Sequence, residues 1–338
     1  MIRDGLPMRI VVLGGSGFIG TRLVKRLLEA GHDVVIGDIR ASETYPYLWR
    51  HCDVRDVNAV KEICEGTDVI YNLAAEHRDD VFPLSRYHEV NVDGARVVCE
   101  AAEATGIDHI IFTSSVAVYG LGTNDADECV QPRPFNEYGR TKLVAEGIYR
   151  EWCSRSAGRR LVIVRPTVVI GEGNRGNFYQ LARQIATGRF VMVGSGKNRK
   201  SMAYVENVAA FLEFGLGFGR GEHVYNYVDK PDLDMNSLVE LIRTELGRAP
   251  RPPFKVPYWL GLLAGAGCDL LRLVTRRNFP LSVVRVKKFC ANTQFNADRA
   301  HSSGFKAPVD LLTGVQRTIA WEFNSAKDRM EWEPVKSI

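Results

Sequence analysis

The sequence predicts an α/β fold in which a doubly wound parallel sheet is followed by a smaller C-terminal domain. Three observations lead to this prediction. Short apolar runs alternate with amphipathic segments, a glycine-rich turn joins the first run to the first amphipathic segment, and the alternation weakens beyond about Gly171. Strands that alternate with helices form parallel βαβ units. With 338 residues, 45% of them hydrophobic, the chain is long enough to bury a full core.

The predicted elements follow one another from Arg9 to Pro166. We expect strands in RIVVLGG, DVVIGD, DVIYNLA, HIIFTSS and RLVIVRP, which begin at residues 9, 33, 68, 109 and 160. We expect helices in FIGTRLVKRLLEAG, EVNVDGARVVCEAAEATG and EYGRTKLVAEGIYREW, which begin at residues 18, 89 and 137. In the first helix, Ile19, Leu23 and Leu27 share one face and Gly31 ends the pattern.

Composition and charge exclude several classes of protein. The formal net charge of +4 is too small to indicate a nucleic-acid partner, and no zinc-finger or RNA-binding signature accompanies it. The seven cysteines are scattered and form no C-x-x-C pair, so we expect reduced thiols, with neither a disulfide framework nor a metal site. No uncharged run reaches the roughly 18 residues of a membrane-spanning helix, and no signal-peptide core begins the chain. These features predict a cytoplasmic protein.

The glycine-rich turn GGSGFIG lies between the first predicted strand and the first predicted helix. Its glycines match both G-x-G-x-x-G (Gly15, Gly17, Gly20) and G-x-x-G-x-x-G (Gly14, Gly17, Gly20). In this context they permit a tight turn and let a diphosphate approach the helix N-terminus. Asp38 ends the second strand, where a carboxylate accepts the ribose hydroxyls and repels a 2′-phosphate. Although Arg40 weakens that repulsion, the pattern favours NAD over NADP in a Rossmann-type fold.

Tyr138 and Lys142, in EYGRTK, are four residues apart and therefore share a helix face. A free tyrosine has a pKa near 10, so a nearby ammonium and a positive nicotinamide are needed to favour the phenolate. That phenolate takes a hydroxyl proton while hydride leaves for NAD. Ser115, at the end of HIIFTSS, is placed to hold the same substrate oxygen. A Y-x-x-x-K pair alone is common on helix surfaces, but its combination with the glycine turn, Asp38 and Ser115 favours a catalytic role.

These motifs resemble those of the extended short-chain dehydrogenase/reductases, which include nucleotide-sugar epimerases and dehydratases. The resemblance extends from Met8 to about Phe323. It implies catalytic roles for Ser115, Tyr138, Lys142 and Asn91, although Asn91 is alternatively an ordinary polar helix residue. The resemblance implies a cofactor site made of Gly14, Gly17, Phe18, Ile19, Gly20, Asp38, Asp53, Val54, Leu73, Ala74, Ala75, Tyr138, Lys142 and Pro166.

We expect the following division of the chain. Residues 8–170 form the NAD-binding Rossmann domain, with a returning contribution from about residues 200–228. Residues 171–199 and 229–325 form the smaller substrate domain. Residues 1–7 are expected to be a loose extension and residues 326–338 a tail.

The residues after Ser115 favour epimerisation over dehydration. Sugar 4,6-dehydratases of the family carry an Asp-Glu pair directly after the catalytic hydroxyl residue, because elimination needs a further acid and base. This chain has Val116 and Ala117 at those positions. The remaining reaction is a 4-epimerisation: a 4-hydroxyl is oxidised to a ketone, the keto-sugar turns, and hydride returns to its other face while NAD stays bound.

The segment GSGKNRKSMAYVEN departs from the pattern of the nucleotide-sugar enzymes. Lys200 and Ser201 stand where those members carry Arg-Asp, whose arginine commonly meets the substrate diphosphate. Instead, LAAEHRDDV, SSVAVYG, NRGN, KSMAYVEN, YNYVDKPDL, VRVKKFCANTQF and HSSGFKAP resemble the subgroup that epimerises N-acetylglucosamine on undecaprenyl diphosphate, for surface polysaccharide (O-antigen) precursors. This resemblance implies a lipid-linked sugar substrate and a homodimer. The candidate substrate contacts are Glu76, His77, Ser115, Asn177, Lys200 and, from its charge alone, Arg285; His77 is alternatively an ordinary loop histidine.

The segment at residues 256–275 is unusually apolar, and its first charged residue is Asp269. It is too short to cross a bilayer, but it is able to lie in the interface with Tyr258 and Trp259 at headgroup depth. The acid-free basic stretch that follows Asp269 would then meet anionic lipid or the substrate diphosphate. The alternative is a buried helix of the substrate domain or a dimer seam. With the lipid-linked resemblance, we expect peripheral association with the inner face of the cytoplasmic membrane.

Two other functions stay open on the sequence. An epimerase of UDP-N-acetylglucosamine or UDP-glucose would keep the 256–275 segment buried. An NAD(P)-dependent reductase or dehydrogenase of a lipophilic alcohol would change NADH concentration steadily, which an epimerase does not.

Overall fold

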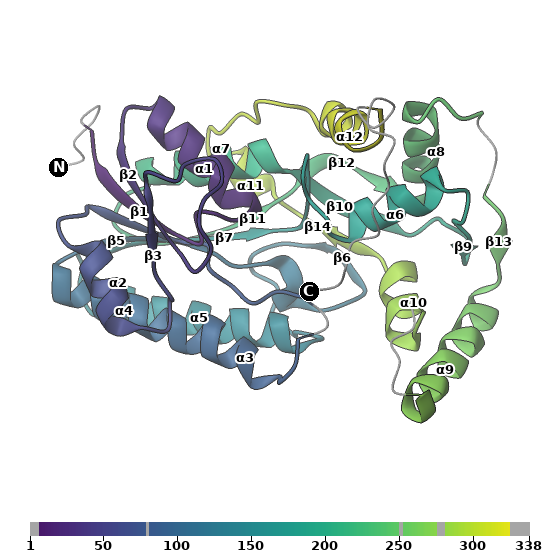
Figure 1. Ribbon diagram of the computed structural model, residues 1–338, viewed down its shortest axis with the longest axis horizontal. Helices are drawn as coiled ribbons and strands as arrows, with labels where there is room; N and C mark the ends of the chain where they lie inside the picture. The colour runs from purple at the N-terminus through teal and green to yellow at the C-terminus, as the bar shows by residue number, and fades with distance from the viewer. Residues whose placement is uncertain (1–6, 79–80, 250–252, 276–280, 325–338) are drawn as a thin grey trace. The chain divides into compact units, whose positions relative to one another are not determined.

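The computed structural model describes residues 7–78, 81–249, 253–275 and 281–324 (Figure 1). Its contacts divide the chain into two units. The first comprises Met1–Val169, Ser201–Asp229 and Thr293–Val309, and the second comprises Ile170–Lys200, Lys230–Asn292 and Asp310–Ile338. The expected tail and all but the last residue of the expected N-terminal extension lie outside the described residues.

The first unit contains a seven-stranded sheet with the strand order β11-β7-β5-β4-β1-β2-β3, and every neighbouring pair is parallel. The strands are β1 (Arg9–Leu13), β2 (Asp33–Asp38), β3 (Trp49–His51), β4 (Val69–Asn72), β5 (His109–Thr113), β7 (Arg160–Pro166) and β11 (Gly221–Tyr227). The chain leaves β1 towards β2 on one side and returns to β4 on the other. Ligands of doubly wound sheets bind where the strand order reverses in this way.

Helices cover both faces of this sheet (Figure 1). One face carries α1 (Phe18–Glu29), α7 (Val205–Phe214) and α11 (Asp298–His301), and the other carries α2 (Val57–Cys64), α4 (Gly94–Thr105) and α5 (Glu137–Ser154). The predicted doubly wound α/β fold is therefore confirmed. The helix expected from residue 89 begins instead as a π-helical turn, η1 (Glu89–Asp93), which continues into α4.

The alternation of side chains along β1 explains why the sheet has a core on each face. Ile10 and Val12 belong to one apolar cluster, in which Leu23 and Leu27 of α1 pack. Val11 and Leu13 belong to the other cluster, with residues of α4 and α5. All four β1 side chains are fully or almost fully buried. Burial on both faces is expected of a parallel strand and explains its continuous apolar sequence.

The remaining elements of the first unit are short. They are α3 (Ser85–His88), η2 (Val116–Tyr119), β6 (Thr123–Ala126), η3 (Gly215–Gly217) and β14 (Thr293–Phe295), and β14 pairs in parallel with β6. The chain passes between the units within β8 (Val168–Ile170), β10 (Arg199–Tyr204) and β12 (Asp229–Asp234).

The second unit is mainly helical. Its elements are α6 (Asn177–Ala186), β9 (Met192–Val193), α8 (Met235–Glu245), β13 (Lys255–Val256), α9 (Tyr258–Thr275), α10 (Val283–Cys290), α12 (Leu311–Ile319) and η4 (Ala320–Asn324). α9 packs against α10, and α6 and α12 both pack against α8. Among the described helices, none combines the length and apolar character needed to span a membrane.

Candidate active site

The glycine turn between β1 and α1 has the shape that a dinucleotide needs. Gly14 has a φ of +78°, and a Cβ at this position would lie 2.6 Å from the Ala74 backbone nitrogen. A Cβ at Gly20 would lie 2.5 Å from the Gly14 carbonyl oxygen. Gly17 caps α1 without a side-chain hydrogen bond, so no cap side chain occupies the amides of its first turn. The turn therefore fits a diphosphate at the helix N-terminus.

Asp38 is held beside this turn at the end of β2. Its Oδ2 accepts a hydrogen bond from the Ser16 backbone N–H at 3.1 Å, and its Oδ1 accepts one from the Arg40 backbone N–H at 3.0 Å. The Ser16 hydroxyl donates to the Arg40 carbonyl at 2.9 Å, which ties the two loops together. The carboxylate therefore has the fixed position expected of a ribose-binding residue.

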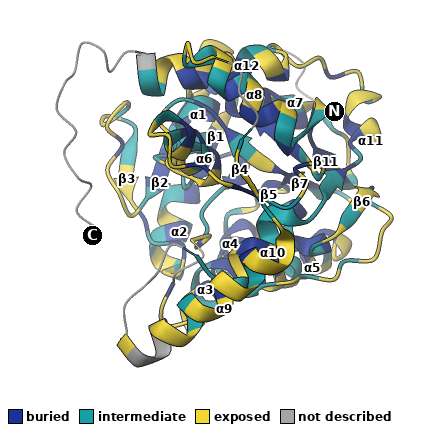
Figure 2. Cartoon of the chain, turned by 90° about the vertical axis from the view of Figure 1, so that its right-hand side faces the viewer, coloured by how far each residue is buried: buried dark blue, intermediate teal, exposed yellow. Residues whose placement is uncertain are grey.

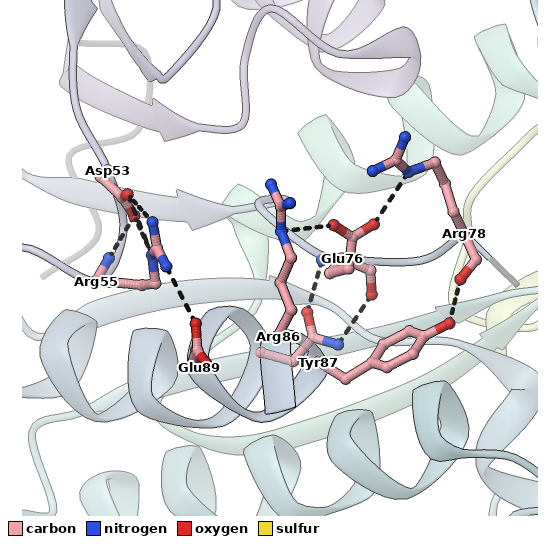
Figure 3. Close-up of polar contacts among 8 residues, drawn as sticks. Asp53, Arg55, Glu76, Arg78, Arg86, Tyr87 and Glu89 are labelled. Carbon is pink, nitrogen blue, oxygen red and sulfur yellow. Dashed lines mark hydrogen bonds and ion pairs between the residues drawn. The ribbon is translucent and has the colours of Figure 1, made fainter. Parts of the chain in front are cut away.

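Asp53 and Val54, the predicted adenine-side residues, differ in how they are engaged. Val54 is buried, and a Cβ on Gly94 would lie 2.9 Å from its Cγ1. Arg55 contacts the Asp53 carboxylate with Nη2 at 2.6 Å and Glu89 with Nη1 at 3.2 Å (Figure 3). The hydrogen bond from Arg55 lowers the pKa of Asp53. An adenine bound at Asp53 would therefore meet a carboxylate that already has a cationic partner.

The other predicted cofactor residues surround the same end of the sheet or lie at the start of α1. Leu73, Ala74 and Ala75 follow β4 and are partly buried. Pro166 is the buried last residue of β7. Phe18 and Ile19 begin α1, and Ile19 packs against the core. Their roles in holding NAD stay predictions.

Ser115 and Tyr138 meet, as the sequence predicts. Their side chains form a hydrogen bond, and Ser115 Oγ also accepts the Ala117 backbone N–H at 3.1 Å because Ser115 caps η2. Burial raises the pKa of Tyr138 to about 12, although the bond to Ser115 acts in the opposite direction. In the protein alone, Tyr138 is therefore a neutral phenol at physiological pH.

Lys142 has a different partner from the one that we expected. It lies on α5 four residues after Tyr138, but its Nζ donates a hydrogen bond to the Thr113 carbonyl oxygen at 2.8 Å. It also lies 4.6 Å from the centre of the Phe112 ring. Burial lowers the pKa of Lys142 to about 7, although Glu146 acts in the opposite direction. The long side chain reaches the carbonyl at the end of β5, so the expected lowering of the Tyr138 pKa by this ammonium is not seen in the protein alone.

Asn91 connects two parts of the site through its buried amide. Its Oδ1 accepts the Glu76 backbone N–H at 2.9 Å, and its Nδ2 donates to the Glu76 carbonyl at 3.0 Å. The same Nδ2 donates to Thr141 Oγ1 at 3.0 Å, on the helix of Tyr138 and Lys142. Asn91 therefore fixes the segment after β4 relative to α5. Its predicted catalytic role stays a prediction.

A buried ion pair beneath the site was not expected from the sequence. Glu146 has no exposed side-chain surface and receives Arg165 Nε at 2.8 Å and Nη2 at 2.6 Å. Ser114 donates to Glu146 at 2.6 Å, and Arg165 Nη1 donates to the Tyr119 hydroxyl at 2.5 Å. This network anchors the end of β5, where Ser115 follows. No local sequence signal indicates this pair, because Arg165 lies on β7 and Glu146 on α5.

Glu76 and His77, the predicted substrate residues after β4, lie in different surroundings. His77 is exposed. Glu76 is buried, and its carboxylate lies between Arg78 and Arg86, with O···Nε distances of 3.4 Å and 3.3 Å (Figure 3). No sequence pattern indicated the pairing of Arg86 with Glu76, because Arg86 belongs to α3, further along the chain.

The other predicted substrate residues belong to the second unit. Asn177 is the exposed first residue of α6, and Arg285 is exposed on α10. Lys200 Nζ donates to the backbone carbonyls of Lys288 at 2.9 Å and Ala291 at 2.6 Å. Burial lowers the pKa of Lys200 to about 8. The ammonium of Lys200 thus stabilises the end of α10 within this unit.

Comparison with known proteins agrees with this geometry. The model of the NAD dependent epimerase/dehydratase family matches residues 10–227, which is more than half of the chain. An N-acetyl-α-D-glucosaminyl-diphospho-ditrans,octacis-undecaprenol 4-epimerase of Escherichia coli O157:H7 is 48% identical over 320 residues, covering 94% of this chain and 96% of the relative. A 2-alkyl-3-oxoalkanoate reductase of Stenotrophomonas maltophilia (strain K279a) is 28% identical, covering 92% of this chain and 98% of the relative.

A solved structure supports the fold alone. MoeE5 in complex with UDP-glucose and NAD superposes with a TM-score of 0.75 at 24% identity, covering 94% of this chain and 99% of MoeE5. This likeness supports the doubly wound α/β fold described above. The family match and the 48% identity to a full-length relative together establish that this chain belongs to the NAD dependent epimerase/dehydratase family.

Proposed function

We propose that this protein converts N-acetylglucosamine into N-acetylgalactosamine on undecaprenyl diphosphate, through a transient 4-keto sugar and with bound NAD. The observation that carries the proposal is the 48% identity, over nearly the full length of both chains, to a 4-epimerase of that lipid-linked sugar. The hydrogen-bonded Ser115 and Tyr138, on the same unit as the glycine turn, supply the groups that the reaction needs.

The chain's own residues hold and move a proton at the sugar 4-oxygen. Ser115 donates to that oxygen, and Tyr138 takes its proton when the hydroxyl is oxidised and returns the proton when the ketone is reduced. NAD, held by the glycine turn and Asp38, supplies hydride acceptance and return. Because burial raises the pKa of Tyr138, its phenolate needs a positive charge nearby, which oxidised NAD would supply when bound.

The groups around Ser115 support epimerisation over elimination. Val116 and Ala117 lie in η2, directly after Ser115, and neither side chain carries an acid or a base. A dehydratase needs such groups at the neighbouring sugar carbons. The keto-sugar is therefore expected to accept hydride on its other face rather than lose water.

The second unit supports a peripheral association with the membrane that holds the substrate. Figure 2 shows that much of α9 is exposed. Trp259, Leu263 and Leu270 lie on one face of this helix, at positions i, i+4 and i+11, and are 60%, 62% and 64% exposed. The opposite side is tightly packed: a Cβ on Gly261 would lie 2.5 Å from Val193, and one on Gly265 would lie 2.8 Å from the Val283 nitrogen. Because the glycine side of α9 is packed, its apolar side remains exposed. Such an exposed apolar face suits the interface of a bilayer.

The charges next to α9 favour an anionic membrane surface. Arg285 and Lys287 are exposed on α10. Asp269 is turned away from the apolar face, because its Oδ2 accepts the backbone N–H of Val283 at 3.1 Å. Arg276 and Arg277 lie outside the described residues. A basic helix beside an apolar one matches the inner leaflet of the cytoplasmic membrane, where O-antigen precursors would be modified.

The experiment that tests the proposed reaction compares two carriers. Purified protein is incubated separately with undecaprenyl-diphospho-N-acetylglucosamine and with UDP-N-acetylglucosamine, and the hexosamine is identified after mild acid release. Galactosamine from the lipid-linked substrate supports the proposal. Conversion of the UDP-linked sugar alone would replace it with a nucleotide-sugar epimerase, and steady NADH formation would replace it with a dehydrogenase.

A further inference from the structure

A pair of arginines shares one buried carboxylate beside the catalytic helix of the first unit. The Glu76 side chain is only 10% exposed, whereas Arg78 and Arg86 are 51% and 47% exposed on either side of it (Figure 3). One carboxylate does not neutralise two guanidinium groups, so these three side chains retain a positive charge. Asp79 and Asp80, which follow Arg78, lie outside the described residues.

The protein fixes this cluster relative to Tyr138. The Asn91 amide clamps the backbone of Glu76 and bonds to Thr141, three residues after Tyr138 on α5. The buried Tyr87 hydroxyl donates a hydrogen bond to the Arg78 carbonyl. Tyr87 is also close enough to Tyr138 to raise its pKa electrostatically. The backbone that carries Glu76 and Arg78 is therefore anchored to the helix of Tyr138.

The orientation of the two guanidinium groups leaves suitable donors. Both contacts with Glu76 involve Nε, at distances longer than a strong hydrogen bond. In both contacts the guanidinium atom nearest to Glu76 is Nε rather than a terminal Nη (Figure 3). A planar guanidinium fork binds two phosphate oxygens at once. This cluster therefore has the chemistry of a diphosphate site.

We propose that Arg78 and Arg86 bind the diphosphate of the lipid-linked sugar, with Glu76 as the residue that positions them. This inference rests on the proposed function. It also accounts for the replacement at Lys200, because that ammonium already donates to two backbone carbonyls in the second unit.

The test uses a soluble probe, N-acetylglucosaminyl diphosphate carrying a short isoprenoid chain, assayed with the full-length enzyme in buffer without membranes. We expect Arg78→Ala and Arg86→Ala each to raise KM by about tenfold, because a charge-assisted pair is lost, with a much smaller change in kcat. Arg78→Lys should recover part of the loss. Arg96→Ala is the matched control, since Arg96 is exposed on α4 and pairs with Asp93.

Two further readouts separate the possible sources of phosphate and the role of Glu76. The Kd for NAD should be the same in the arginine variants and the wild type; a weakened Kd with an unchanged KM would assign the arginines to the cofactor and overturn the proposal. Glu76→Gln should raise KM for the probe while leaving the thermal unfolding midpoint unchanged. A lowered midpoint with an unchanged KM would show a structural role only.

The decisive outcomes are distinct. A double variant, Arg78→Ala with Arg86→Ala, that keeps the wild-type KM on an active enzyme overturns the diphosphate assignment and leaves the proposed reaction intact. A wild-type enzyme that fails to convert the probe but converts UDP-N-acetylglucosamine overturns the proposed function, and the assignment to a lipid diphosphate falls with it.

Discussion

The helices α5 and α9 are both 18 residues long, but they depart from the usual burial of side chains in opposite ways. α5 buries Lys142 and Glu146, whereas α9 exposes Trp259 and Leu263. Burying a charge is costly unless a partner compensates it, and exposing an apolar face is costly unless something covers it. Each helix therefore departs from the usual burial pattern at the place where we propose its function, which is proton transfer for α5 and contact with lipid for α9.

The strongest test of the chemistry on α5 is Tyr138→Phe. We expect at least about a hundredfold loss of turnover, because the group that takes the sugar proton is removed while the ring is kept. The Kd for NAD should change little, since the glycine turn and Asp38 are untouched. Turnover by the variant within a few-fold of the wild type would contradict the role of Tyr138.

Glu146→Ala tests whether the buried ion pair of Glu146 with Arg165 stabilises the fold. This change leaves Arg165 buried without its carboxylate, so we expect a loss of about 3–5 kcal/mol in the free energy of unfolding, measured by urea denaturation. Glu137→Ala on the same helix is the control: its pair with Arg140 is exposed, and we expect a loss below about 1 kcal/mol. Equal losses would break the distinction between the buried and the exposed pair.

The buried His109 in the first unit also predicts that the free energy of unfolding falls at acid pH. Burial lowers the pKa of His109 to about 3, so folded His109 stays neutral while the unfolded chain takes up a proton below pH 6.5. The unfolded state then binds more protons, and stability falls as the pH falls. Between pH 7 and pH 5, this residue should remove about 2 kcal/mol of stability.

The measurement compares urea denaturation of wild-type protein and His109→Gln at the two pH values. We expect the variant to lose about 2 kcal/mol less than the wild type over this interval, because its side chain does not titrate. The same pH dependence in both proteins would show that His109 is not the responsible group.

Much of the first unit was predictable because its signals are local. The glycine turn, Asp38 and the i, i+4 pair of Tyr138 and Lys142 each depend on residues near one another in sequence. The doubly wound fold and NAD as cofactor are confirmed.

The features that were not predictable depend on long-range packing. The sequence favours a lysine beside the catalytic tyrosine, but it does not show that Lys142 reaches the Thr113 carbonyl instead. The Arg86–Glu76 pair joins residues across a loop, and Arg165 meets Glu146 from another strand. The apolar sequence of α9 is compatible with burial or exposure, and only the packing of its glycine side on Val193 and α10 decides between them.

Turnover of a variant with charges on α9 tests most directly whether α9 serves contact with lipid while α5 serves proton transfer. Trp259→Glu with Leu263→Glu is assayed on N-acetylglucosaminyl-diphospho-undecaprenol in anionic vesicles and on the soluble short-chain substrate. Val191→Glu with Leu312→Glu is the control, because both residues are exposed in the same unit outside α9. We predict a loss of at least about tenfold on vesicles, or about 1.4 kcal/mol, with turnover of the soluble substrate retained. Equal turnover of vesicle substrate by variant and wild type would contradict the account.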